Sequence, residues 1–313
     1  MLNTEQSPFQ STKLISLNKY FDEMVKLYDS DSFPKVLLLN GKKGIGKFTL
    51  VFHFLNYIYS KKEKTHYNVK DKLINPDSNF YNSILNQTCE DVIFFRAVEG
   101  KNIKIDDVRR LKSILTRTTL SDNPRFTIID EVEFLNISSV NALLKTLEEP
   151  TEKNFFILIN NQQADLIKTI SSRCLKNNIY LNLDQRKRIV DYFIENKKID
   201  SVFDDIDYLT PGLFLKYNVL FKKCKIAKDD NILLKLSKLL NSYKKDKDDD
   251  IINMTIFFVE HFFLQQAKKN TNKINFLLNL KSSIVKRIND FAIYNLNIKS
   301  VLNNIEVKLK NVR

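Results

Sequence analysis

The sequence predicts an α/β domain built on a parallel sheet, followed by a second half made of helices. Short apolar runs such as Val36–Leu39, Phe126–Asp130 and Phe155–Ile159 alternate with segments of helical periodicity. This alternation is typical of a parallel sheet covered by helices on both faces. Beyond about residue 183 the strand-like runs stop, while apolar residues keep the spacing of helices.

Each element of the first half is recognised by its own pattern. Val36–Leu39 is a short apolar run that stops at Asn40-Gly41, as a buried strand does at a turn. Ser139–Glu149 has apolar residues at i, i+3, i+4 and i+7, and Pro150 ends this helix. In chain order the predicted elements are strand Val36–Leu39, helix Phe48–Tyr59, strand Asp91–Arg96, helix Ile105–Leu115, strand Phe126–Asp130, helix Ser139–Glu149, strand Phe155–Ile159 and a weaker strand Asn178–Leu181.

The second half is helical in pattern. Asp184–Asn196 and Pro211–Lys225 are predicted as short helices, and helices continue from Asp229 onward. The charged stretch Lys244–Asp250 is interpreted as a solvated connection between two of them. The chain is therefore divided into three predicted parts, an α/β domain over residues 1–182, a small helical domain over 183–228 and a helical C-terminal domain over 229–313.

Composition limits the classes of protein that this chain can be. Of its 313 residues, 43% are hydrophobic and 28% charged, which fits a soluble globular protein. The net charge of +13 suggests a polyanion such as nucleic acid as a partner, and A/T-rich coding is an equal alternative explanation. Three separated cysteines favour a reducing cytoplasm and exclude a four-cysteine zinc site. No membrane span or secretory signal is expected.

A glycine-rich loop lies between the first predicted strand and the next helix. In Gly41-Lys-Lys-Gly44-Ile-Gly46-Lys47, glycines would let backbone N–H groups surround phosphate oxygens, and Lys47 would reach the outer phosphates. Mg²⁺ binding needs Ser or Thr directly after the lysine, but Phe48 stands there. Thr49 lies about 100° further around the helix. The loop is therefore predicted as a P-loop without competent Mg-ATP hydrolysis, and a P-loop kept only for its turn is the alternative.

Two further signals follow at the spacing of a P-loop domain. The strand Phe126–Asp130, followed by Glu131, resembles a Walker B element, in which Asp130 would help hold Mg²⁺ and Glu131 would polarise water. A strand-end acid in solvent is the alternative. Ser172-Arg173-Cys174 follows the third strong strand, where an exposed arginine can complete a neighbouring subunit's active site. A surface arginine in a local salt bridge is the alternative there.

Taken together, four segments resemble a known family. They are Gly41–Thr49, Asp130-Glu131, the NALLKTLEEP string Asn141–Pro150 and Ser172-Arg173-Cys174. Their order and spacing are similar to those of bacterial clamp-loader subunits of the AAA+ family. The similarity is dense over residues 30–182 and thin beyond. It implies a RecA-like ATPase-type domain, a helical lid and a helical collar that binds other subunits.

Within this family the chain resembles the delta prime type more than the gamma/tau motor type. The motor type has Thr where this chain has Phe48, and it carries a four-cysteine zinc module where this chain has only Cys89. Lys104–Leu111 and Asn295–Leu309 also look like delta prime segments. In Thr210–Leu213, where hydrolysing relatives often place a sensor arginine, no arginine is present.

The resemblance implies a stator, a non-hydrolysing subunit of the DNA polymerase III clamp loader, which helps place the sliding clamp on primed DNA in the cytoplasm. Arg173 would be an arginine finger at a neighbour's ATP site. Expected partners are gamma/tau and delta subunits in a hetero-pentamer, with clamp and primed DNA reached through the complex and no membrane. A motor subunit and a solitary P-loop enzyme are the alternatives. Whether ATP binds stays open; Mg²⁺ is expected only if it does, and no zinc is expected. A nucleotide site would comprise Gly41, Gly44, Gly46, Lys47, Thr49, Asp130 and Glu131.

Overall fold

The computed structural model describes residues 7–96, 103–116, 122–197, 199 and 208–310. Contacts between Cα atoms divide the chain into two compact units. The first comprises residues 1–199 and 205–215, and the second comprises residues 200–204 and 216–313. The predicted boundary between lid and collar at residue 228 is not tested by this division and stays a prediction.

A five-stranded parallel sheet forms the centre of the first unit. Its strand order is β2-β3-β4-β1-β5, and every pairing is parallel. This confirms the predicted fold class, a parallel α/β sheet followed by helices. The strands are β1 (Val36–Asn40), β2 (Val92–Arg96), β3 (Arg125–Asp130), β4 (Asn154–Asn160) and β5 (Leu175–Asn178).

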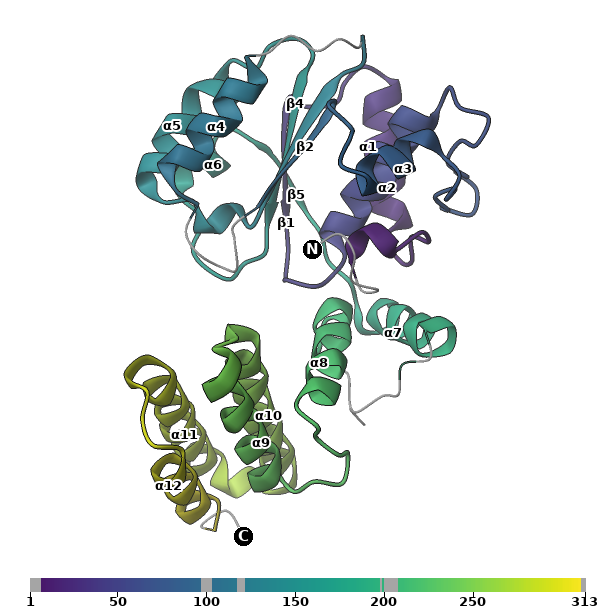
Figure 1. The fold of residues 1–313 in the computed structure, drawn as a ribbon. Coiled ribbons are helices and arrows are strands. Elements are labelled where there is room, and N and C mark those ends of the chain that lie inside the picture. Colours follow the sequence, from purple (N-terminus) through teal and green to yellow (C-terminus); the bar gives the residue numbers. More distant parts are fainter. Residues whose placement is uncertain (1–6, 97–102, 117–121, 198, 200–207, 311–313) are drawn as a thin grey trace. The chain divides into compact units, whose positions relative to one another are not determined.

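Helices cover both faces of the sheet (Figure 1). One face carries α1 (Asn18–Asp29), α2 (Lys47–Ser60) and α3 (Asn79–Leu85). The other face carries α4 (Ile105–Leu115), α5 (Ile137–Glu148) and the short α6 (Lys168–Ser171). Sequence periodicity located α2, α4 and α5 to within two residues at each end. Neither α1 nor α3 was predicted.

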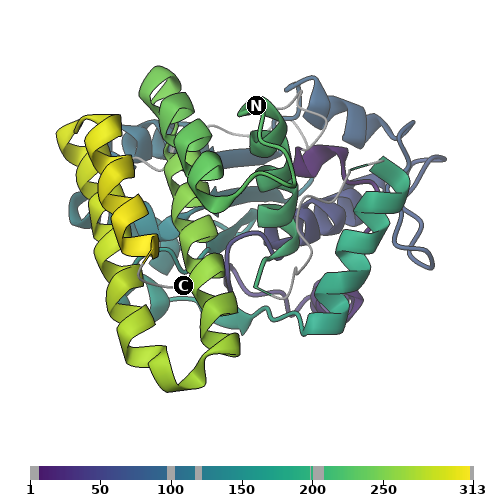
Figure 2. The same ribbon diagram turned by 90° about the horizontal axis from the view of Figure 1, so that it is seen from below.

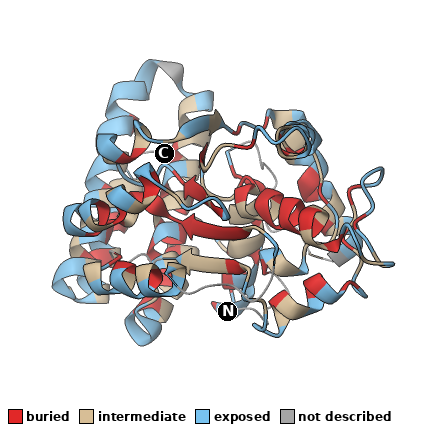
Figure 3. Cartoon of the chain, turned by 90° about the horizontal axis from the view of Figure 1, so that it is seen from above, coloured by how far each residue is buried: buried red, intermediate tan, exposed pale blue. Residues whose placement is uncertain are grey.

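Two hydrophobic clusters fill the space between the sheet and these helix layers. Alternate residues of one strand serve opposite faces, so Leu37 and Leu39 join the cluster under α2, whereas Val36 and Leu38 join the cluster under α5. The strands β1, β3 and β4 are buried almost throughout, and Figure 3 shows buried strands in red at the centre of the sheet. Burial on both faces explains why apolar runs, and not alternating patterns, marked the central strands.

The fifth strand lies three residues earlier than the sequence predicted. The predicted segment was Asn178–Leu181, and the observed β5 is Leu175–Asn178. Among the described strands it pairs with β1 alone, at the edge of the sheet, and most of it is exposed, so it shows no apolar pattern. The apolar residues Ile179 and Leu181 that gave the signal are buried just beyond the strand.

Helices α7 (Leu183–Lys197) and α8 (Pro211–Lys223) follow the sheet, and α8 crosses the boundary between the two units. The second unit then contains α9 (Ile232–Asp246), α10 (Asp249–Lys269), α11 (Ile274–Tyr294) and α12 (Ile298–Lys310). Helix α9 packs against α10 and α12, and α11 packs against α10 and α12 (Figure 2, green to yellow). Their buried faces keep helical spacing, as in Leu236, Leu239, Leu240 and Tyr243 of α9.

The predicted solvated connection is shorter than expected. Helix α9 continues through Lys244 and Lys245 to Asp246, and α10 begins at Asp249. Lys247 adopts a positive φ of 52°, which ends α9, and the Asp248 side chain accepts a hydrogen bond from the Asp250 amide at the start of α10. Among the described residues, no helix has the length and apolar character that a bilayer crossing requires.

Candidate functional site

The glycine-rich loop joins the end of β1 to the start of α2, as a P-loop requires. Gly44 and Gly46 have φ values of +81° and +92°, which L side chains rarely adopt. Gly41 lies so close to the Ile179 carbonyl that a side chain would collide with it. The three glycines of the predicted site therefore shape the backbone of the loop.

Lys47 is turned back onto its own loop. Its ammonium group donates hydrogen bonds to the carbonyls of Gly41 at 2.7 Å and Lys42 at 2.8 Å. The residue is only 3% exposed. Burial lowers the pKa of Lys47 to about 8, against the opposing influence of the acidic side chains Asp130 and Glu133. The lysine that would reach phosphates is engaged within the loop.

Phe48 packs into an aromatic cluster at the start of α2. Its ring lies 5.1 Å from that of Phe9 and 5.5 Å from that of Phe94. Phe9 also meets Phe52 edge-on at 5.0 Å. The position that needs a hydroxyl for Mg²⁺ thus holds a side chain that joins the N-terminal segment to β2 and α2. Thr49 lies next along α2 and is half-buried.

Two basic side chains neutralise the acids at the end of β3. Lys43 of the P-loop donates to the Glu131 carboxylate at 2.9 Å, and Arg96 lies 3.4 Å from both Asp130 and Glu131. Arg96 ends β2 directly beside Asp130, since the two residues are paired in the register of neighbouring strands. The two carboxylates therefore meet cations supplied by the chain itself.

Burial and these cations set the protonation of the two acids. Burial raises the pKa of Asp130 above its ordinary value, and the charge of Arg96 opposes it. Burial acts in the same direction on Glu131, but Arg96 and Lys43 together hold the pKa of that carboxyl below its ordinary value. Glu131 is accordingly an ionised, internally paired carboxylate with a positive φ of 59°.

Polar groups after β4 complete this network. The Asn161 side chain donates to Asp130 at 3.0 Å, and the Asn161 amide donates to Glu133 at 3.0 Å. Gln163 accepts a hydrogen bond from Lys43 at 2.9 Å. The ends of β2, β3 and β4 are thereby bound to the P-loop by side-chain contacts.

Thr210 and the first residues of α8, which belong to the same compact unit, lie against the P-loop. The Thr210 hydroxyl donates to the Lys43 carbonyl at 2.8 Å, and the Gly212 amide donates to the Gly44 carbonyl at 2.7 Å. A Cβ on Gly212 would come within 2.7 Å of the Gly44 Cα atom. The outer side of the loop is thus in direct backbone contact with residues 210–212.

In this arrangement the residues do not fit a bound Mg²⁺–nucleotide complex. Phe48 offers no oxygen ligand, and both carboxylates that would organise the metal are paired with Lys43 and Arg96. The Lys47 ammonium is bound by loop carbonyls. The predicted nucleotide-site residues lie at the carboxyl ends of the strands and the start of α2, where Lys47 bonds to loop carbonyls and both acids pair with Lys43 and Arg96.

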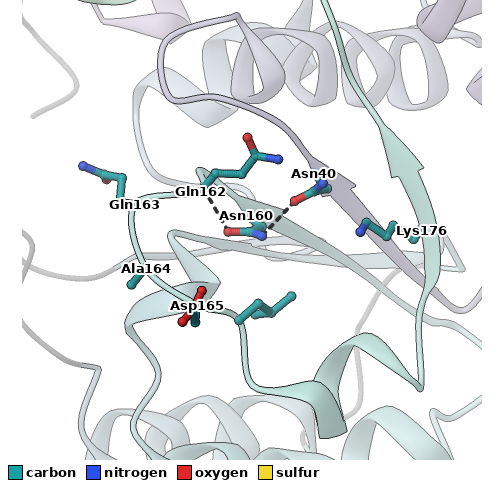
Figure 4. Close-up of a pocket in the computed structure, with 8 residues that line it drawn as sticks. Asn40, Asn160, Gln162, Gln163, Ala164, Asp165 and Lys176 are labelled. Atoms are coloured by element: carbon teal, nitrogen blue, oxygen red, sulfur yellow. Dashed lines mark hydrogen bonds between the residues drawn. The ribbon is translucent and has the colours of Figure 1, made fainter.

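A polar hollow of about 510 Å³ opens beside this network (Figure 4). Asn160 donates to Asn40 at 2.8 Å and accepts from the Gln162 amide at 3.0 Å. The amides at its base therefore satisfy one another. Its lining consists of Asn40, Asn160, Gln162, Gln163, Ala164, Asp165, Leu166 and Lys176.

Arg173 lies near the amino ends of the strands, whereas the P-loop follows the carboxyl end of β1. It follows α6 and precedes β5, whose first residue Leu175 is paired with Leu37 at the beginning of β1. Its guanidinium donates to the Glu148 carboxylate at 2.5 Å through Nε and to the Thr169 carbonyl at 2.8 Å through Nη1. The side chain is 32% exposed. The predicted finger is a surface arginine with a defined orientation.

Several residues of these sites were missed in the sequence. Lys43, Arg96, Asn161 and Glu133 carry no motif of their own, and Glu148 was recognised only as part of a string. Arg96 could have been found, because it ends a predicted strand and parallel strands end at one edge of a sheet. The contact with residues 210–212 had no sequence signal, since it joins distant segments.

Comparisons with known proteins agree with these features. The family described as DNA polymerase III, delta subunit, matches residues 17–181. DNA polymerase III subunit delta' of Buchnera aphidicola subsp. Schizaphis graminum is 27% identical over 188 residues, covering 59% of this chain and 54% of the relative. Subunit gamma of Buchnera aphidicola subsp. Acyrthosiphon pisum is 26% identical, covering 52% and 44%. The chain spans about half the length of these relatives.

Among solved structures, a DNA polymerase III gamma subunit-related protein of Thermotoga maritima is 17% identical with a TM-score of 0.46, covering 95% of this chain and 99% of that one. The family match covers more than half of the chain and includes the P-loop and the strands around it. The chain therefore belongs to the DNA polymerase III delta subunit family and is a member of the clamp-loader family.

Proposed function

We propose that this chain is the delta prime, or stator, subunit of a DNA polymerase III clamp loader, and that Arg173 serves as an arginine finger for a neighbouring ATPase subunit. In this role it would help load a sliding clamp onto primed DNA, in the cytoplasm, as one member of a hetero-pentamer with gamma/tau and delta subunits. Clamp-loader relatives of the delta', gamma and tau types support this assignment.

The observation that carries the proposal is the position of Arg173 relative to the P-loop. Arg173 lies two residues before the level of Leu37, and the P-loop begins at Gly41, four residues beyond it. At about 3.3 Å per residue, Leu37 and Gly41 are roughly 13 Å apart along the strand, and Arg173 lies in the turn before β5. An arginine side chain does not extend so far, so Arg173 can serve only a phosphate brought by another molecule.

The electrostatics of the chain support the same division of roles. A guanidinium near a departing γ-phosphate stabilises the developing charge, an effect worth about 10³–10⁵ in rate for arginine fingers. The chain's own site binds its cations and acids to one another and holds Phe48 in place of a Mg²⁺ ligand. The nucleotide site is therefore proposed to be vestigial, with a structural role for the P-loop.

The test is ATP hydrolysis by the reconstituted complex with clamp and primed DNA. Native chain is compared with Arg173→Ala, and with Lys168→Ala as a control that removes one exposed positive charge from α6, the short helix just before Arg173. Size-exclusion chromatography verifies assembly of each complex. The chain alone is assayed under the same conditions.

The proposal expects an inert isolated chain, a strong loss of turnover with Arg173→Ala in an intact complex, and native turnover with Lys168→Ala. Hydrolysis by the chain alone would favour the alternative, an ATP-hydrolysing gamma/tau-type motor subunit. Unchanged turnover with Arg173→Ala in an intact complex would leave only an architectural role and refute the finger.

A further inference from the structure

The guanidinium of Arg173 is held through two of its three nitrogen atoms. Nε donates to Glu148, and Nη1 donates to the Thr169 carbonyl at 2.8 Å and to the Ser172 hydroxyl at 3.4 Å. Arginine has five N–H donors in a rigid planar fork, and these contacts use the three on Nε and Nη1. In the part of the chain that the structure describes, the two donors on Nη2 are the ones not used by these bonds.

We infer that Glu148 is a positioning residue for Arg173, holding the guanidinium so that its Nη2 end faces outward to a neighbour's phosphate. This inference rests on the proposed role of Arg173 as a finger and adds the residue that orients it. Glu148 ends α5, and Arg173 follows α6, so the pair joins two helices of one compact unit.

Glu148 is suited to orient the finger without blocking it. It binds Nε, so a phosphate can approach the Nη2 donor that points away from Nε while the Glu148 contact persists. The pair is partly exposed, with side-chain exposures of 32% for Arg173 and 44% for Glu148. Exposed ion pairs contribute little to stability. The contribution of the Glu148–Arg173 pair is therefore to the orientation of the Arg173 guanidinium, because transition-state stabilisation depends on preorganised donors.

The sequence offers a matched control. Glu149 follows Glu148 directly, carries the same charge, and is also exposed, whereas the ion pair with Arg173 involves Glu148. Comparing the two substitutions separates loss of this contact from loss of one negative charge at the end of α5.

The test uses the reconstituted complex with Arg173→Ala, Glu148→Ala, Glu148→Gln, Glu149→Ala and the double variant Arg173→Ala/Glu148→Ala. From the usual strength of exposed ion pairs, Glu148→Ala should lower kcat about two- to five-fold with KM for ATP unchanged. Glu148→Gln keeps a hydrogen-bond acceptor and should recover part of the loss. The double variant should be no slower than Arg173→Ala, because Glu148 acts through Arg173.

The measured rates of these variants distinguish failure of the inference from failure of the proposed function. If Arg173→Ala slows the complex but Glu148→Ala matches Glu149→Ala, positioning by Glu148 is refuted and the finger stands. If Glu148→Ala speeds turnover, Glu148 competes with the phosphate and the inference is again wrong. If Arg173→Ala changes nothing in an intact complex, the proposed function fails and the inference fails with it. Additive losses in the double variant would indicate a structural effect of Glu148.

Discussion

The turned-back P-loop lysine makes a specific prediction about stability and pH. In the folded chain the pKa of Lys47 is about 8, because burial disfavours its charge, whereas in the unfolded chain it returns to 10.5. The unfolded chain therefore binds more protons between these two pH values, and the free energy of unfolding rises as pH increases through this window. One pKa unit corresponds to about 1.4 kcal/mol, so the full change is about 3 kcal/mol.

The assay is urea unfolding of the native chain and of Lys47→Met from pH 7 to 10.5. Lys47→Met retains the length of the side chain and has no titrating group. The native chain should gain about 3 kcal/mol relative to the variant across this range, with most of the gain above pH 8. Other groups titrate in both chains and cancel in the difference.

Parallel stability curves for the two chains would refute the reasoning. They would mean that Lys47 keeps its ordinary pKa, in contradiction to the burial of its side chain in the folded chain. The description of a P-loop closed upon itself would then lose its main support.

Two further predictions concern the same unit. Burial lowers the pKa of His53 to about 4, so the free energy of unfolding should fall as pH drops from 6.5 to 4. In urea titrations the native chain should lose about 3 kcal/mol relative to His53→Gln. Equal losses in both chains would contradict this. Phe48→Thr should still bind no Mg-ATP by calorimetry, because Lys43 and Arg96 keep the acids paired. The same variant should lose about 1–3 kcal/mol of stability, because it removes the two aromatic contacts of Phe48. Micromolar binding by this variant would show that Phe48 alone prevents nucleotide binding.

The sequence predicts elements well where burial is uniform and poorly where tertiary contacts decide. The strands β1, β3 and β4 are buried on both faces, so their apolar runs stand out. The edge strand β5 is polar and exposed, and its signal was displaced onto Ile179 and Leu181. The helix α1 has an amphipathic pattern that was overlooked.

The candidate site divides in the same way. Glycines and acids of the P-loop and β3 were predicted because fixed spacing places them on one sheet edge. The pairing of the acids with Lys43 and Arg96 and the contact of Gly212 with the P-loop were not predicted, because these contacts join residues far apart in the sequence. The side chain of Glu148 likewise meets Arg173 across 25 residues.

The most direct test of the central claim is the rate of ATP hydrolysis in a single turnover at the motor subunit facing this chain, measured in the assembled complex with native chain and with Arg173→Ala. The account predicts a rate lower by at least ten-fold with the variant, while nucleotide binding by the motor subunit is unchanged, because the arginine acts only as charge develops. An unchanged rate in a complete complex would contradict it.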